Sequence, residues 1–116
     1  MVLPEFHQLV NEAKKEISEI QVVELKRMQQ AGERFVLVDV REPDEVSRGT
    51  IPGAIPIPRG TLELHIDEAA PDKNAKVVLY CGGGSRSALA AQSLKRMGYK
   101  NPISLAGGWK AWTQAA

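Results

Sequence analysis

The chain has 116 residues, of which 43% are hydrophobic and 25% charged, and its 15 basic and 14 acidic side chains leave a net charge of +1. This composition is typical of one small globular domain, and it excludes a strongly basic nucleic-acid-binding surface. No apolar run approaches the roughly 20 residues of a membrane span, and the glutamate-containing N-terminus lacks the apolar core of a secretory signal. The single cysteine cannot form an intramolecular disulfide, so we expect a reducing, cytoplasmic setting.

The first segment carries apolar residues at helical spacing, which predicts an amphipathic helix within residues 1–18. The apolar stripe consists of Phe6, Leu9, Val10, Ala13 and Ile17. A lone helix of this length is marginal in water, so the stripe must pack on its own domain or on a partner. We therefore divide the chain into an N-terminal helical extension, 1–18, and a main domain, 19–116. The choice between a monomer and a homodimer stays open.

Strands and helices alternate along the rest of the chain. Strands are predicted at 20–21, 35–40, 54–58, 76–80 and 102–105. Helices are predicted at 22–30, 43–49, 61–66, 85–97 and 108–114, and a polar loop at 67–75. This alternation is typical of a small α/β domain with a parallel sheet of four or five strands. Ligands of such domains bind beyond the carboxyl ends of the strands.

The only cysteine lies at one of these strand ends. Residues 77–86 read VVLYCGGGSR, so that Cys81 follows a strand and Arg86 lies in the first turn of the next helix. The first amides of a helix have no intrahelical partner, its dipole is positive there, and glycines let N–H groups converge on one point. We expect Gly83 to need a positive φ. The stretch is interpreted as a cradle for negative charge around a nucleophilic thiolate.

Four ordered motifs resemble the single-domain rhodanese-like sulfurtransferases. They are LVDVREPDE at 37–45, GTIPGAIPIP at 49–58, CGGGSR at 81–86 and LAGGWKAW at 105–112. The resemblance spans about residues 20–115 and implies a three-layer domain with a central parallel sheet flanked by helices. It also implies an enzyme of the thiosulfate sulfurtransferase type that needs no cofactor. Its substrate would be a small sulfur-containing anion or a persulfide, and its acceptor cyanide, a thiol or a protein.

The resemblance assigns roles to individual residues. Cys81 would be the nucleophile and persulfide carrier, and Arg86 the second catalytic residue, which holds the loop and the anion. Substrate would be bound by the loop residues Gly82, Gly83, Gly84 and Ser85. Arg59, which follows the third strand, is expected at the rim of the same pocket. We interpret Asp39 and Arg41 as a structural pair, Trp109 and Trp112 as packing residues, and His7 and His65 as surface residues.

Other functions were weighed against this one. Dual-specificity phosphatases of the cell-cycle type resemble this fold, but their loop is one residue longer than the four residues between Cys81 and Arg86, and a smaller ring suits a sulfur atom better than a phosphate group. A catalytically inactive binding module is disfavoured by the presence of the cysteine. A sulfur relay to a protein acceptor is not separated from the enzyme by sequence. Zinc is excluded because one cysteine and two unclustered histidines do not form a site.

Overall fold

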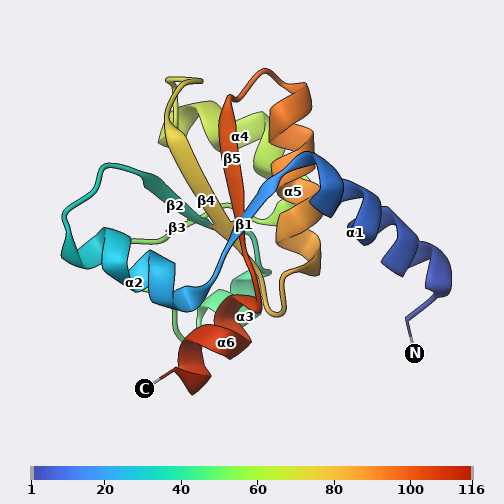
Figure 1. Ribbon diagram of the computed structural model, residues 1–116, viewed down its shortest axis with the longest axis horizontal. Coiled ribbons are helices and arrows are strands. Elements are labelled where there is room, and N and C mark those ends of the chain that lie inside the picture. Colours follow the sequence, from blue (N-terminus) through green and yellow to red (C-terminus); the bar gives the residue numbers. More distant parts are fainter. Residues whose placement is uncertain (1, 116) are drawn as a thin grey trace.

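The computed structural model describes residues 2–115 and confirms the predicted α/β fold (Figure 1). Five parallel strands form one sheet in the order β1-β5-β4-β2-β3. The strands are β1 Ser18–Ile20, β2 Val36–Asp39, β3 Ile55–Pro56, β4 Lys76–Tyr80 and β5 Asn101–Leu105. The helices are α1 Pro4–Glu16, α2 Val22–Gln30, α3 Pro43–Val46, the 3-10 turn η1 Arg59–Thr61, α4 Leu62–Ala69, α5 Ser85–Arg96 and α6 Gly108–Gln114.

Two apolar cores lie on opposite faces of the sheet, as the central strand β4 shows. Val77 and Leu79 pack in the core beneath α4 and α5, whereas Val78 and Tyr80 pack in the core beneath α2 and α6. Successive side chains of a strand point to opposite faces, so a continuous apolar run is what a strand covered on both sides requires. The result is the expected three-layer arrangement.

The edge strand β3 is protected by its prolines. The amide of Ile57 donates to the carbonyl of Asp39 in β2 at 2.9 Å, which joins the segment to the sheet. Pro56 has no N–H group to offer to an additional strand. Prolines on an exposed edge prevent further strand pairing, so the sheet ends here.

The N-terminal helix packs on α5 of its own domain. Val10 and Ala13 are buried against Ala88, with Phe6 and Leu89 partly buried around them. The small side chains of Ala13 and Ala88 let the two helices approach along a narrow line. The prediction that the whole apolar stripe packs against another surface is therefore wrong at Leu9, whose side chain is 55% exposed. None of the helices within residues 2–115 has the length and hydropathy that a bilayer span requires.

Some element boundaries differ from those predicted. Helix α1 ends at Glu16, and Ile17 adopts an extended conformation that leads into β1. Helix α4 continues through residues 67–69, which were predicted to be loop, because its last turns bury Ile66 and Ala70 beneath the sheet. Local polarity suggested a loop there, but burial against the sheet overrides it.

The division into an extension and a main domain remains a prediction that deletion tests. Removing residues 2–15 exposes the α5 surface that Val10 and Ala13 cover, so we expect the free energy of unfolding to fall by about 2–4 kcal/mol. Chemical denaturation measures this loss. The rate of alkylation of Cys81 per folded molecule should stay within about threefold, since surface changes remote from a reacting group act mainly on stability. A well-folded truncation with a strongly altered alkylation rate would instead place the helix beside the cysteine.

Candidate active site

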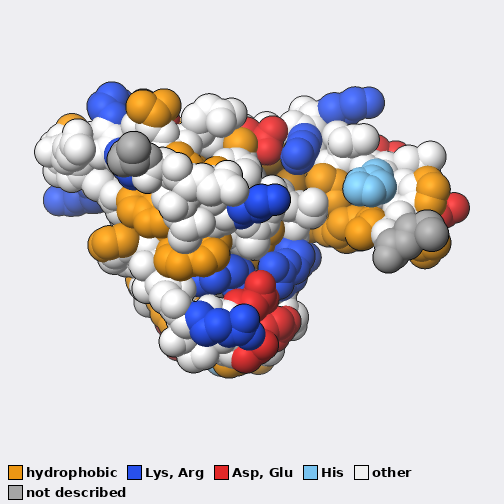
Figure 2. Space-filling model, turned by 90° about the horizontal axis from the view of Figure 1, so that it is seen from below, with side chains coloured by type: hydrophobic (Ala, Val, Ile, Leu, Met, Phe, Trp, Pro, Cys, Tyr) orange, Lys and Arg blue, Asp and Glu red, His pale blue; other side chains and the backbone are white. Residues whose placement is uncertain are grey.

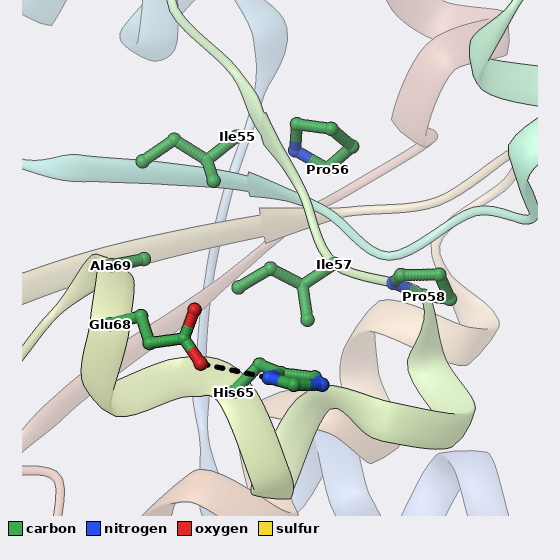
Figure 3. A pocket seen from close by; sticks show the side chains of 7 residues that line it. All are labelled: Ile55, Pro56, Ile57, Pro58, His65, Glu68 and Ala69. Carbon is green, nitrogen blue, oxygen red and sulfur yellow. Dashed lines mark hydrogen bonds and ion pairs between the residues drawn. The ribbon is translucent and has the colours of Figure 1, made fainter.

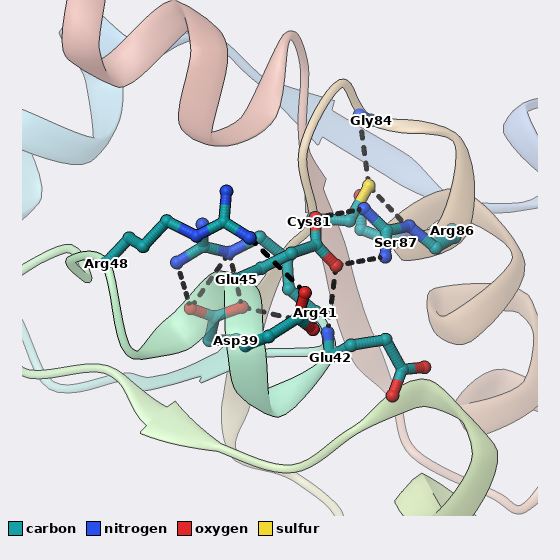
Figure 4. Close-up of polar contacts among 10 residues, drawn as sticks. Asp39, Arg41, Glu42, Glu45, Arg48, Cys81, Gly84, Arg86 and Ser87 are labelled. Atoms are coloured by element: carbon teal, nitrogen blue, oxygen red, sulfur yellow. Dashed lines mark hydrogen bonds and ion pairs between the residues drawn. The ribbon is translucent and has the colours of Figure 1, made fainter.

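The loop that follows β4 wraps its backbone around the Cys81 sulfur. Cys81 is 1% exposed, and its Sγ accepts hydrogen bonds from the amides of Gly84 at 3.1 Å and Ser87 at 3.4 Å (Figure 4). The first bond within α5 is donated by Ala88 to the Gly84 carbonyl. The earlier amides of the helix thus have no intrahelical acceptor, and one of them turns to the sulfur. Hydrogen bonds to a sulfur in this position stabilise its charged form.

The positive φ of this loop lies at Gly84 and not, as predicted, at Gly83. Gly84 has φ 107° and directly precedes α5. A Cβ at this position would lie 3.3 Å from the amide nitrogen of Gly107 and 3.6 Å from the carbonyl oxygen of Leu105. A Cβ at Gly83 would meet nothing within 4 Å. Gly84 therefore serves the backbone, while a side chain at the exposed Gly83 would extend into open space.

Two buried hydroxyls lie behind the sulfur. The Cys81 thiol donates to Ser87 Oγ at 3.5 Å, and Ser87 Oγ is hydrogen-bonded to Ser104 Oγ of β5 at 2.8 Å. Both serines are fully buried. A hydroxyl rotates to suit its partner, so Ser87 can accept from the thiol or donate to the thiolate while Ser104 completes its bonding. These serines were missed by the sequence analysis.

Helix α6 closes the loop from the other side. The amides of Trp109 and Lys110 donate to the carbonyls of Cys81 at 2.8 Å and Gly82 at 3.0 Å. Gly108 directly precedes Trp109 and has φ 53°. A Cβ on Gly108 would clash with the Cys81 carbonyl oxygen, so the backbones could not approach this closely with a larger residue. The glycine pair of the LAGGWKAW motif thus permits direct backbone contact with the cysteine loop.

Arg86 is held by a carboxylate that the sequence analysis also missed. Its Nη1 and Nη2 donate to Glu45 of α3 at 2.8 and 3.0 Å (Figure 4). Glu45 Oε1 also accepts the Glu42 amide at 3.0 Å, which completes a capping box at the start of α3. The hydrogen bonds from Arg86 lower the pKa of Glu45 to about 2. The loop and α3 are thereby connected by a bidentate ion pair.

A buried ion pair links the end of β2 to the segment that follows α3, as the structural reading of Asp39 and Arg41 expects. Arg41 donates to Asp39 Oδ1 and Oδ2 at 3.0 and 2.8 Å and to the Gly49 carbonyl at 2.7 Å. Its guanidinium lies 4.7 Å from the ring centre of Trp109. Hydrogen bonding to Asp39 raises the pKa of Arg41. Trp109 is consequently a packing residue that joins α6 to this pair.

Arg59 lies in a separate network. Its Nη1 is 2.9 Å from Glu63 Oε2, and Glu63 in turn accepts from Ser93 Oγ of α5 at 2.5 Å. The guanidinium hydrogen bonds of Arg59 thus go to α4 rather than to the cysteine loop. The structure brings together Cys81, Gly82, Gly83, Gly84, Ser85 and Arg86, which are contiguous in the chain, and leaves the role of Arg59 at the rim a prediction.

A hollow of about 280 Å³ opens between β3 and α4 (Figure 3). Its lining residues are Ile55, Pro56, Ile57, Pro58, His65, Glu68 and Ala69. His65 Nδ1 lies 2.9 Å from Glu68 Oε2, and the imidazole is half-exposed, as predicted for a surface residue. No residue of the cysteine loop, 81–86, is among the residues that line this hollow.

The fold and loop define a small α/β domain with a buried cysteine, held by backbone amides, at the carboxyl edge of its sheet, and comparison places it in a family. Residues 21–115 match the family model of the rhodanese-like domain. A sulfurtransferase of Allochromatium vinosum is 34% identical over 98 residues, which cover 84% of this chain and 90% of that protein. The YrkF protein of Bacillus subtilis is 33% identical over 97 residues, or 84% of this chain, which spans only 51% of that relative.

A solved structure agrees over nearly the whole chain. It belongs to a protein of unknown function from Rhodopseudomonas palustris, named as a possible tyrosine phosphatase. The two structures superpose with a TM-score of 0.85 at 34% identity, over 97% of this chain and 92% of that one. The chain belongs to the rhodanese-like family.

Proposed function

We propose that this protein is a sulfurtransferase that moves a sulfane sulfur from thiosulfate or a persulfide to cyanide, a thiol or a protein acceptor through a persulfide on Cys81. The observation that carries the proposal is the pair of amides, from Gly84 and Ser87, that donate to the sulfur. This arrangement stabilises a thiolate nucleophile without a neighbouring base. The sulfurtransferase name of a relative of similar length supports the same chemistry.

The first half-reaction breaks the sulfur–sulfur bond of the donor. The Cys81 thiolate attacks the outer sulfur of thiosulfate, a new sulfur–sulfur bond forms, and sulfite departs with the bonding electron pair. Charge is conserved, because the negative charge of the thiolate passes to the persulfide. Amides of the loop between Gly82 and Arg86 would stabilise this charge, as donors placed where charge develops do in other enzymes.

The second half-reaction returns the thiolate. Cyanide or a thiolate attacks the outer sulfur of the persulfide, and the electron pair of the broken bond returns to Cys81. The outer sulfur of a persulfide extends about 2 Å beyond Sγ. This places the transferable sulfur farther out than the buried Sγ, which would let a cysteine that is 1% exposed hand sulfur to an acceptor.

The remaining predicted residues have supporting roles in this proposal. Gly82, Gly83 and Ser85 would present amides or space to the donor, and Arg86 would fix the loop through Glu45. Arg59 would act at the rim only on substrates that extend beyond η1. A phosphatase would need the arginine of the loop to bind a phosphate dianion, and here both terminal nitrogens of Arg86 already donate to the Glu45 carboxylate.

Steady-state and single-turnover kinetics test the proposal. A covalent persulfide predicts ping-pong kinetics with thiosulfate and cyanide. It also predicts that thiosulfate alone releases sulfite in an amount equal to that of the protein. Sequential kinetics, or no sulfite release before an acceptor is added, would contradict a persulfide intermediate and favour a module that binds without turnover.

Replacing Gly83 with Val should damage activity more than stability. The residue has no positive φ and its Cβ meets no atom within 4 Å, so a side chain costs little in the fold. The same side chain would stand on the loop that holds the sulfur and would restrict the approach of a donor to it, and we expect kcat/KM to fall at least about tenfold. Gly60→Val is the matched control, because Gly60 is equally open and also lacks a positive φ. Equal losses of melting temperature and activity in Gly83→Val would show that this glycine serves folding alone.

A further inference from the structure

The charge beside Cys81 is balanced rather than positive. Glu45 engages both terminal nitrogens of Arg86, at 2.8 and 3.0 Å, so that the only cation of the CGGGSR loop is paired. The Arg86 hydrogen bonds hold the pKa of Glu45 at about 2, and the carboxylate is therefore ionised throughout the neutral range. An anion that approaches the loop meets a fixed negative charge as well as a positive one.

The carboxylate lies close to the loop, next to the guanidinium. A Cβ on Gly82 would be 3.2 Å from Arg86 Nη2 and 3.9 Å from Glu45 Oε2. Figure 4 shows Glu45 between the cysteine loop on one side and the ion pairs Asp39–Arg41 and Asp44–Arg48 on the other. At these separations the two charges nearly cancel for any group beyond them.

The surrounding surface does not restore a positive field. The neighbouring guanidinium groups are also paired: Arg41 with Asp39 and Arg48 with Asp44. Figure 2 views the molecule from below Figure 1, which is the side of the carboxyl ends of the strands. Basic and acidic side chains lie next to one another on this face. Lys110 follows on α6, but it is exposed, and solvent and salt screen its charge.

We infer that the site selects sulfur donors that react as neutral molecules, namely the protonated hydropersulfides of thiols, over the thiosulfate dianion. This inference rests on the proposed function and names its donor class. With a hydropersulfide, the Cys81 thiolate attacks the outer sulfur, which keeps its proton, and the donor leaves as a thiolate. A monoanion then meets a neutral molecule, whereas thiosulfate brings a dianion toward a thiolate beside a carboxylate.

The test compares kcat/KM for thiosulfate and for the hydropersulfide of 2-mercaptoethanol in Glu45→Gln. A glutamine whose amide oxygen takes the place of Oε1 can still accept from Arg86 Nη1 and from the Glu42 amide, so this change removes the charge and keeps two of the three hydrogen bonds. We expect the ratio of thiosulfate to hydropersulfide kcat/KM to rise about three- to tenfold. An unchanged ratio would overturn the inference.

Two further variants separate charge from position. Asp44→Asn also removes a negative charge from α3, but this charge pairs with the exposed Arg48. The ratio of kcat/KM for thiosulfate to that for the hydropersulfide should therefore stay within about twofold of its value in the unaltered protein. An equal rise in this variant would overturn the role of Glu45. Glu45→Ala releases Arg86, so kcat/KM should fall for both donors if Glu45 also positions that residue. A rise for both donors would contradict the positioning role.

The salt dependence of the unaltered protein gives a measurement that needs no variant. With a balanced site, kcat/KM for thiosulfate should hold steady or rise with sodium chloride, since screening weakens repulsion between like charges. A steep fall would show that a positive field attracts the donor and would overturn the inference. If no donor places sulfur on Cys81, the proposed function itself fails, which is a different result from a changed donor ratio.

Discussion

Cys81→Ser is expected to lower thiocyanate formation from thiosulfate and cyanide by at least about a thousandfold. Serine is nearly isosteric, and its hydroxyl can accept from the Gly84 and Ser87 amides that now donate to the sulfur. It cannot form a persulfide, so the covalent route is lost while the loop is retained. Steady-state assay of thiocyanate measures the effect.

The fold of this variant is the control. Its melting temperature and far-ultraviolet circular dichroism should match those of the unaltered protein, since the replaced side chain is buried and of similar size. Appreciable thiocyanate formation by folded Cys81→Ser protein would mean that the nucleophile lies elsewhere. Since the chain has only one cysteine, that result would remove the persulfide mechanism altogether.

Gly108→Ala is expected to lower the free energy of unfolding by about 3 kcal/mol or more and to reduce sulfur transfer by about a hundredfold. The added Cβ would fall on the Cys81 carbonyl oxygen, so α6 and the cysteine loop must separate. That separation breaks the bonds from Trp109 and Lys110 to the loop carbonyls. Urea denaturation and the thiocyanate assay measure the two losses.

Gly32→Ala separates this clash from the cost of backbone strain. Gly32 has φ 65°, close to the 53° of Gly108, but a Cβ there would meet nothing within 4 Å. Its replacement should cost only the roughly 1–2 kcal/mol of a left-handed alanine and leave sulfur transfer intact. If both glycine variants lose stability and activity equally, the contact between α6 and the loop is not what holds the site.

The central part of the site was predictable because it is local in the chain. The apolar run of β4, Cys81, the glycines and the start of α5 are contiguous, and their roles follow from rules that act over a few residues. The same locality explains why α2 and α6 were predicted with their observed bounds. The pair of Asp39 and Arg41 was indicated by the motif that contains both residues.

The supports of the loop were not predictable because distant elements supply them. Glu45 of α3 reaches Arg86 across 41 positions of sequence, and Ser104 of β5 reaches Ser87 across 17. The positive φ was assigned to Gly83 instead of Gly84, since three successive glycines give no signal of which one turns the backbone. Gly108 stands out in the sequence only as part of a motif. The need for glycine at this position comes from its tertiary contact with the Cys81 carbonyl oxygen.

Mass spectrometry of the Cys81 peptide tests the central claim most directly. The protein is mixed with thiosulfate, or with the hydropersulfide of 2-mercaptoethanol, without an acceptor, and is digested under conditions that preserve persulfides. The account predicts that the peptide gains the mass of one sulfur atom and loses it again when cyanide is added. A folded protein whose Cys81 peptide gains no sulfur from either donor would contradict the account.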